Sequence, residues 1–462
     1  MWPRRCTPVL VMFAMTLSSC AGQGPYRVRN DAVEYFPADT SHCPKLQTSS
    51  PLRIPIAYVE IDEQGAFHYQ DRDQVQQALA LVAEGTRPKY VVVFVHGWFH
   101  SAAKDDANVA AFKRALNYLQ CIDDNAGEEV VGIYIGWRGE SWTLPVLRFA
   151  TFWDRKNTSE EIGRGSLVEF LMRLEATVKP NPASLNKLMV VGHSFGASVV
   201  FNSIGQILLA RFLLDAEKLA SVEPRPSHAQ TKPGLVSGYG DLVVLVNPAI
   251  EATRIVPFFT ALNDYTAKSP DLLSPAQPPR LVILSSQGDS ATRRTFPIAR
   301  AVATTLESYQ NAQVRTPYGQ EIELRERYLD WQTMGNVEGL LTHEPLRKKS
   351  TAPWDGTCPP AQPEWLKAAI EARKGEQRRM GERETGAGWS TVFDGTSIGL
   401  KHRGVTTPSN PLWLMPVGAE LIPNHSGITD SDIICFFNTI LGDPKVTNPE
   451  GQRHLDRLRR SK

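Results

Sequence analysis

The stretch that most constrains this chain runs from Lys187 to Ala210. It opens with a short apolar run of strand length at residues 188–191 and closes with a long apolar run of helix length at residues 199–210. Between the two runs stands the pattern Gly-x-Ser-x-Gly, centred on Ser194. Flanking glycines let a strand turn sharply into a helix without Cβ clashes. The pattern therefore predicts a serine hydroxyl exposed at the carboxyl edge of a sheet.

A second motif follows a continuous apolar run at residues 90–95, which predicts a central parallel strand buried on both faces. The motif is His96-Gly97-Trp98-Phe99-His100. Together the two motifs resemble the α/β-hydrolase serine esterases and lipases, in which two backbone N–H groups bind the oxyanion. The resemblance implies that Trp98 and Phe195 supply those groups here. We expect His96 to brace its loop and do no chemistry.

A serine hydroxyl becomes a good nucleophile only when a base takes its proton, and the base needs a third group to orient it. In the fold that the resemblance implies, the chain order is serine, acid, histidine. Asp289 follows a predicted strand at residues 280–286, and His425 lies between a strand-like run and a predicted final helix. We therefore expect Ser194 to be the nucleophile, His425 the general base and Asp289 the orienting acid.

Other residues compete for these roles. Glu251 follows the preceding predicted strand and is a second candidate for the acid, while His343 and His402 are second candidates for the base. Trp137 and Arg138 follow a predicted strand at the same sheet edge, so they either line a substrate pocket or form a buried aromatic and a structural ion pair. Further candidates for the pocket come from the second motif: His96, Phe99 and His100.

Strands that alternate with helical segments predict a mostly parallel sheet. The resemblance implies the α/β-hydrolase fold, with helices on both faces of the sheet. We place this domain at residues 52–445. Residues 290–407, where the pattern loosens, are interpreted as an insertion or cap between the last two core strands, and residues 446–462 as a flexible tail.

The first residues have the outline of a secretory signal: basic residues, then an apolar run at residues 9–15, then Leu17-Ser18-Ser19-Cys20. The ending resembles the lipobox of bacterial lipoproteins, whose cysteine is acylated. The resemblance implies a signal peptide at residues 1–19, lipid on Cys20 and a tether over residues 20–51. It also implies residence in the cell envelope, and Ala21 favours the outer membrane. The alternative is an ordinary cleaved signal with a chance cysteine.

Export would permit disulfides. The cysteines that remain after Cys6 and Cys20 are Cys43, Cys121, Cys358 and Cys435, which allow three pairings. Cys435 lies in an apolar helical run and equally fits a free buried thiol. The net charge of +1 gives no reason to expect a nucleic-acid surface. No zinc-ligand spacing or phosphate-binding glycine loop is present, so we expect neither a metal nor a cofactor.

The resemblance implies acyl transfer to water through an acyl-serine intermediate. We expect a carboxylic ester as substrate, either a small molecule or a lipid. Lipases, thioesterases and some peptidases share the same parts, and a hydrolase scaffold can also serve as a non-catalytic binding or assembly module of the envelope. The sequence leaves open the acyl and alcohol groups of the substrate and the oligomeric state.

Overall fold

The computed structural model describes most of the chain. The described residues are 24–28, 31–39, 52–68, 72–122, 127–139, 152–181, 184–221, 234–347, 371, 374–375, 390–392, 398–428 and 431–441. The predicted signal peptide with Cys20, the predicted tail at 446–462, and Cys43 and Cys358 lie outside the described residues.

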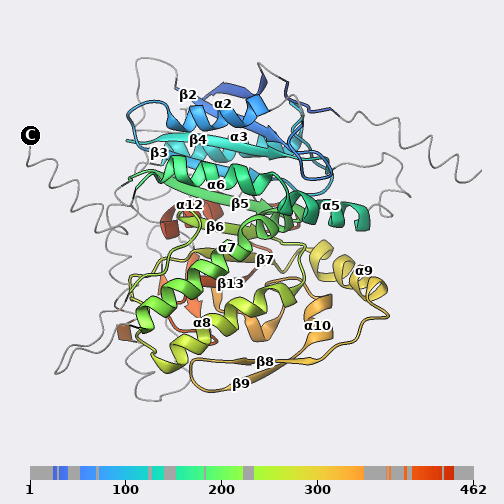
Figure 1. Ribbon diagram of the computed structural model, residues 1–462, viewed down its shortest axis with the longest axis vertical. Coiled ribbons are helices and arrows are strands. Elements are labelled where there is room, and N and C mark those ends of the chain that lie inside the picture. The colour runs from blue at the N-terminus through green and yellow to red at the C-terminus, as the bar shows by residue number, and fades with distance from the viewer. Residues whose placement is uncertain are drawn as a thin grey trace, which may run out of the picture.

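The fold is built on an 8-stranded sheet with the strand order β1-β2-β4-β3-β5-β6-β7-β13 (Figure 1). The strands are β1 (Val33–Pro37), β2 (Arg53–Glu60), β3 (Lys89–Val95), β4 (Glu129–Gly136), β5 (Lys187–His193), β6 (Leu242–Val246), β7 (Leu281–Ser286) and β13 (Leu412–Val417). Only the edge strand β1 pairs antiparallel, with β2, and the other neighbours are parallel. The prediction of a mostly parallel sheet is therefore confirmed.

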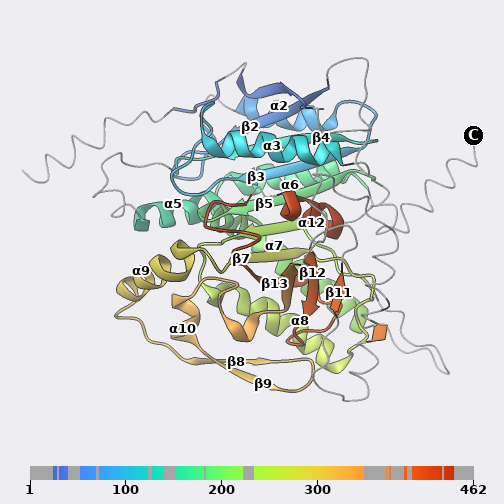
Figure 2. The ribbon, with the colours of Figure 1, turned by 180° about the vertical axis from the view of Figure 1, so that it is seen from behind.

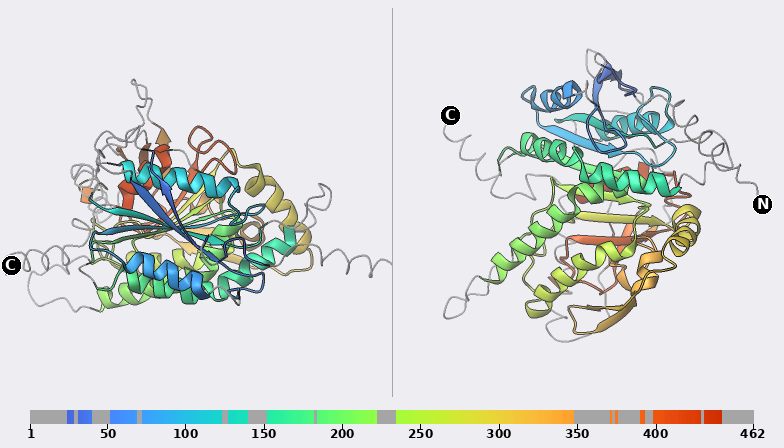
Figure 3. Two further views of the ribbon diagram at one scale, coloured as in Figure 1. Left: turned by 90° about the horizontal axis from the view of Figure 1, so that it is seen from above. Right: turned by 45° about the vertical axis from the view of Figure 1, so that its right-hand side comes forward.

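The central strands are apolar because they are covered on both sides. Every residue of β3, β5, β6 and β7 is buried, as expected for parallel strands between two layers of helices. One face carries α2 (Arg72–Ala83), α5 (Phe152–Arg164), α6 (Leu167–Val178), α7 (Phe195–Ala220) and α8 (Val256–Lys268), and the other carries α3 (Ala107–Cys121) and α12 (Ser431–Leu441) (Figures 1, 2 and 3). Two apolar cores result, one on each side of the sheet.

Among the described helices, only α7 is long and apolar enough to span a bilayer. More than half of its apolar window is buried inside the protein, where α7 packs on β5, α5 and α8. Its composition therefore reflects a position at the centre of one apolar core.

The segment between β7 and β13 carries several small elements. They are the π-helix η4 (Ala291–Thr295), α9 (Phe296–Ala303), β8 (Asn311–Arg315), β9 (Glu321–Arg325), α10 (Glu326–Trp331), the 3-10 helix η5 (Glu338–Leu340), β10 (His343–Arg347), β11 (Ser390–Val392) and β12 (Ile398–His402). β11 and β12 are antiparallel neighbours in a three-stranded sheet with β10. β8 and β9 form a separate two-stranded sheet.

The expectation that residues 20–51 are only a tether is wrong. The predicted tether contains β1, which pairs with β2, and the guanidinium of Arg27 is buried 3.9 Å from the ring centroid of Tyr58. Residues 24–28 and 31–39 therefore belong to the folded domain. Between β4 and β5 the helices α5 and α6 separate where Gly165 touches Gly65: a Cβ on Gly165 would lie 2.1 Å from the Gly65 carbonyl oxygen.

Two cysteines lie on the helices that cover the second face of the sheet. Cys121 ends α3 and Cys435 lies in α12, and both are disulfide-bonded. The interpretation of Cys435 as a free buried thiol is therefore wrong.

Candidate active site

Ser194 stands on a strained bend between β5 and α7. Its backbone has φ 56° and ψ −121°, a left-handed conformation that costs a non-glycine residue of the order of 1–3 kcal/mol. The backbone N–H of Ser194 donates to the carbonyl of Val246 at 3.0 Å, which fixes the bend to the neighbouring strand. The sequence pattern predicted this conformation.

Two glycines allow the bend to lie against the end of β3. A Cβ on Gly196 would come 2.1 Å from the carbonyl oxygen of Val95, and a Cβ on Gly97 would come 2.9 Å from the Cβ of Ser194. Real side chains do not approach so closely, so only glycine fits at either position. The loop that follows β3 is thereby held in direct contact with the serine.

Three side chains from distant parts of the chain meet at this edge of the sheet. The Nε2 of His425 lies 2.8 Å from the Oγ of Ser194, and its Nδ1 lies 2.7 Å from Oδ2 of Asp289. A carboxylate only accepts hydrogen bonds, so Nδ1 carries the ring proton and Nε2 is left to accept from the serine hydroxyl. The arrangement can move a proton from serine to imidazole.

Asp289 is fully buried and heavily hydrogen-bonded. Its Oδ1 accepts from the backbone N–H of Ala291 at 2.8 Å, and its Oδ2 accepts from the hydroxyl of Thr292 at 2.7 Å. Burial by itself raises the pKa of Asp289, but the hydrogen bonds from His425 and Thr292 outweigh burial, and the pKa is lowered. The carboxylate is therefore charged at neutral pH.

The loop that carries His425 is held by two side chains that the sequence did not single out for this purpose. The backbone carbonyl of His425 accepts from Nε2 of His193 at 2.7 Å and from Nδ2 of Asn247 at 3.0 Å. Oδ1 of Asn247 accepts from the N–H of Ser286 at 2.8 Å, and the hydroxyl of Ser286 donates to the carbonyl of Ile422 at 2.5 Å. Asn247 directly follows β6 and has a φ of 47°. Its position at the end of a strand was the signal by which the sequence could have indicated a role at the site.

His193 is neutral in the folded protein. It is buried, and burial together with the nearby His425 lowers its pKa to about 3. Its proton therefore stays on Nε2, the atom that donates to the carbonyl of His425.

The buried His96 braces its loop, as predicted. Its Nδ1 donates to the carbonyl of Gly97 at 2.9 Å, and its Nε2 accepts from the backbone N–H of Trp137 at 3.1 Å. The indole of Trp137 donates to the carbonyl of His96, and the two rings stack with centroids 5.5 Å apart. Burial lowers the pKa of His96 to about 4. Trp137 is therefore a buried aromatic, and together with Arg138 it also lines a polar pocket beside Glu60 and Glu63.

The remaining candidates for the pocket divide into two groups. The ring of Trp98 stacks on that of Phe99 at 4.1 Å and lies 5.9 Å from the ring of Phe195, so these aromatics stand beside the serine. His100 instead pairs with Asp106, with Nδ1 and Oδ1 3.1 Å apart. The guanidinium of Arg138 lies 3.7 Å from a carboxylate oxygen of Glu63, so it has the structural ion pair that was the alternative reading.

The predicted oxyanion hole consists of the backbone N–H groups of Trp98 and Phe195. Phe195 is the first residue of α7, and the N–H groups of the first helical turn have no acceptor within the helix. The contact between the two rings keeps the loop after β3 next to this helix start.

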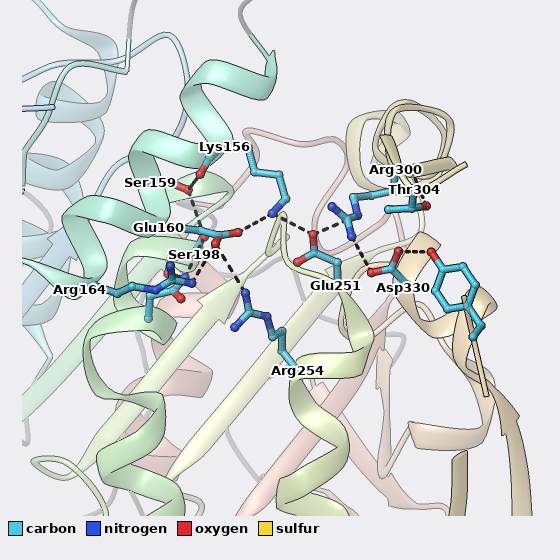
Figure 4. Close-up of polar contacts among 12 residues, drawn as sticks. Lys156, Ser159, Glu160, Arg164, Ser198, Glu251, Arg254, Arg300, Thr304 and Asp330 are labelled. Carbon is cyan, nitrogen blue, oxygen red and sulfur yellow. Dashed lines mark hydrogen bonds and ion pairs between the residues drawn. The ribbon is translucent and has the colours of Figure 1, made fainter. Parts of the chain in front are cut away.

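The alternative acid, Glu251, belongs to a network of ion pairs on the side of the sheet covered by α5 and α7 (Figure 4). Its carboxylate lies 2.8 Å from Nζ of Lys156 and 3.1 Å from Nε of Arg300, and Arg300 also pairs with Asp330 at 2.6 Å. His425 forms its hydrogen bond with Asp289 instead of Glu251.

The alternative bases lie in the small sheet of the insertion. His343 and His402 are partners across β10 and β12, with ring centroids 5.0 Å apart. The ring of His343 also packs on Trp413, near the start of β13, whereas His425 follows the opposite end of that strand. The structure therefore brings neither of them to Ser194. Among the described residues, no group of three His, Cys, Asp or Glu side chains is placed to hold a metal ion.

Comparisons with known proteins add little to this geometry. The sequence matches no protein-family profile and no curated protein. A solved structure to which the chain is similar is esterase B from Lactobacillus rhamnosis, inhibited by a tributyrin phosphonate, at 15% sequence identity and a TM-score of 0.20. The match covers 65% of this chain and 81% of that chain. A similarity this weak carries no weight for fold or function.

Proposed function

We propose that this protein is a serine hydrolase of the α/β-hydrolase fold that cleaves carboxylic esters. The observation that carries the proposal is the continuous set of hydrogen bonds from Ser194 through His425 to the buried Asp289. The strained strand-to-helix bend at Ser194 supports it independently, because such strain concentrates at functional positions.

The proposed reaction proceeds in two halves. Nε2 of His425 takes the hydroxyl proton while Oγ of Ser194 attacks the ester carbonyl, and the N–H groups of Trp98 and Phe195 stabilise the oxyanion. The C–O bond to the alcohol then breaks, and His425 gives its proton to that alcohol. Water, deprotonated by His425, attacks the acyl-serine, and the acid is released as Ser194 regains its proton.

The surroundings of the serine favour an ester with an apolar part. The rings of Trp98, Phe99 and Phe195 lie together, and Phe152 at the start of α5 lies 5.7 Å from Trp98. Such a wall binds apolar groups and excludes water from an acyl-enzyme.

We further propose that the protein is exported and held in the cell envelope by lipid on Cys20. The signal pattern and the lipobox-like ending motivate this proposal. The disulfides at Cys121 and Cys435 are in keeping with it, because disulfides persist in oxidising compartments outside the cytosol.

The proposed activity is tested with a fluorophosphonate probe and a set of matched p-nitrophenyl substrates: an acetate ester, the corresponding thioester and the corresponding anilide. We expect covalent labelling of Ser194, mapped by peptide mass spectrometry, and the highest kcat/KM for the ester. An unlabelled protein that cleaves none of the three would overturn the proposal. Preferential cleavage of the anilide would keep the nucleophile and change the substrate class.

A further inference from the structure

An apolar slot lies between the sheet and the two helices on its second face. Its floor is formed by β3 and β5, including Phe94 and Val191, and its walls by α3 and α12. Figure 2 shows these two helices next to each other over the strands. The cavity volume of the slot is about 70 Å³.

One side of the slot is formed by α3. It follows α3 from Asn108 to Leu119, which is roughly 16 Å at the rise of an α-helix. Room remains there because α3 presents two alanines, Ala111 and Ala115, to the slot. Residues four apart lie above one another on the same face of a helix, so the two small side chains leave space at neighbouring levels of the slot.

One end of the slot adjoins the proposed active site. His193 and Ser426, which line it, are the chain neighbours of Ser194 and His425. His193 also donates to the carbonyl of His425 at 2.7 Å. A Cβ on Gly97 would lie 2.9 Å from Cβ of Ser194 and 3.3 Å from Nδ1 of His193, so the backbone of Gly97 packs against both of these residues.

We propose that this slot binds the acyl chain of the substrate and selects chains of medium length. The inference rests on the proposed ester hydrolysis, because it is Ser194 that would place the ester carbon at the mouth of the slot. Each methylene group that becomes buried should raise kcat/KM about fourfold.

The test fills the slot at two depths and measures kcat/KM for p-nitrophenyl acetate, butanoate, octanoate and hexadecanoate. Ala115→Phe fills the part nearer to Leu119, and Ala111→Phe fills the part nearer to Asn108. We expect the octanoate-to-acetate ratio of kcat/KM to fall at least tenfold in Ala115→Phe. We expect the butanoate-to-acetate ratio to fall as well in Ala111→Phe.

The control is Ala110→Phe, which places the same side chain on the exposed face of the same helix. Its ratios should equal those of the unmodified protein. If Ala115→Phe keeps the full octanoate-to-acetate ratio while the unmodified protein hydrolyses both esters, the slot is not the acyl site and the proposed function stands.

Binding without turnover separates the two proposals. Calorimetry with octanoate, on the Ser194→Ala and Ser194→Ala/Ala115→Phe variants, measures the slot in the absence of hydrolysis. Binding by the first variant that is lost in the second supports the slot, even for a protein that hydrolyses no ester. Absence of binding in Ser194→Ala, or equal binding by both variants, overturns it.

Discussion

Nε2 of His193 donates a hydrogen bond of 2.7 Å to the backbone carbonyl of His425. The residue before the proposed nucleophile thus holds the residue proposed as its base, although 232 positions separate the two in the chain. The hydrogen bond depends on a neutral imidazole at His193, which burial secures by lowering its pKa to about 3. The end of strand β5 therefore positions both Ser194 and His425, the two partners of the proposed proton transfer.

Substitution of Ser194 tests the nucleophile. Ser194→Ala should lower kcat by roughly four to six decades and abolish labelling by a fluorophosphonate, because no other hydroxyl contacts Nε2 of His425 among the described residues. The thermal midpoint should not fall. Ser203→Ala is the matched control, since Ser203 lies buried in the same helix and donates only to Val199. Substantial residual activity in Ser194→Ala would show that the nucleophile lies elsewhere.

A pair of isosteric changes distinguishes the two candidate acids. Asp289→Asn should lower kcat by about four decades, because an amide favours the wrong tautomer of His425. Glu251→Gln should leave kcat within a few fold and lower the thermal midpoint, because it weakens the buried pairs with Lys156 and Arg300. The reverse pattern would show that Glu251 orients the base.

Asn247 should affect kcat by holding His425 in position. Asn247→Asp keeps the acceptor for Ser286 and removes the donor to the carbonyl of His425. Loss of this hydrogen bond should lower kcat about tenfold with KM unchanged. A general loss of stability would instead lower the thermal midpoint and leave the kcat of the folded fraction intact. Steady-state kinetics and thermal unfolding of the same sample separate the two outcomes.

The free energy of unfolding should fall as the pH drops below about 6.5. In the folded protein the pKa is lowered to about 3 for His193 and to about 4 for His96, whereas both groups titrate near their ordinary value in the unfolded chain. The unfolded chain therefore binds protons that the folded protein does not. Between pH 6 and 4 the two groups together should remove up to roughly 2.7 kcal/mol per pH unit.

The variant His193→Gln checks the assignment of this effect. Glutamine can still donate to the carbonyl of His425 but does not titrate, so the pH dependence of the unfolding free energy should be about half as steep. Urea unfolding at pH 5, 6 and 7 gives the slopes. An unchanged slope in the variant would show that His193 takes up its proton in the folded state.

The proposed lipid anchor is tested at the N-terminus. Cys20→Ser should abolish metabolic labelling with an alkyne fatty acid and leave either the precursor or a protein that washes off membranes, since stable attachment needs acyl chains. Cys6→Ser, within the predicted signal peptide, should be labelled and anchored normally. Membrane retention of an unlabelled Cys20→Ser protein would overturn the anchor.

Much of the fold and of the candidate site could be predicted from patterns within short stretches of the sequence. The bend at Ser194 was predictable because the strand period, the two glycines and the helix period lie within one stretch. The contact of His425 with Asp289 was predictable because each follows a late strand of a parallel sheet. The antiparallel edge strand β1 could not be predicted, because it is short and its pairing with β2 leaves no local signal in the sequence.

Other features depend on packing between distant segments. The sequence could not show that His193 and Asn247 donate to the carbonyl of His425, because a backbone carbonyl is the same in every residue; the position of Asn247 at the end of a strand was the only signal. The orientation of Trp137 was undecidable for a related reason: the stacking on His96 is set only when β3 and β4 pair.

The parallel pairing of β13 with β7 has a consequence for when the protein becomes active. Ser194 and Asp289 are translated long before His425, and the loop with His425 reaches them only after β13 has joined the edge of the sheet. Closing so long a connection is slow compared with local contacts. A chain still emerging from the ribosome or crossing a membrane would thus hold a serine with no base. The proposed hydrolysis would become possible only after β13 and the loop with His425 had been synthesised and had folded onto the sheet. The order of synthesis would therefore prevent activity in an incomplete chain.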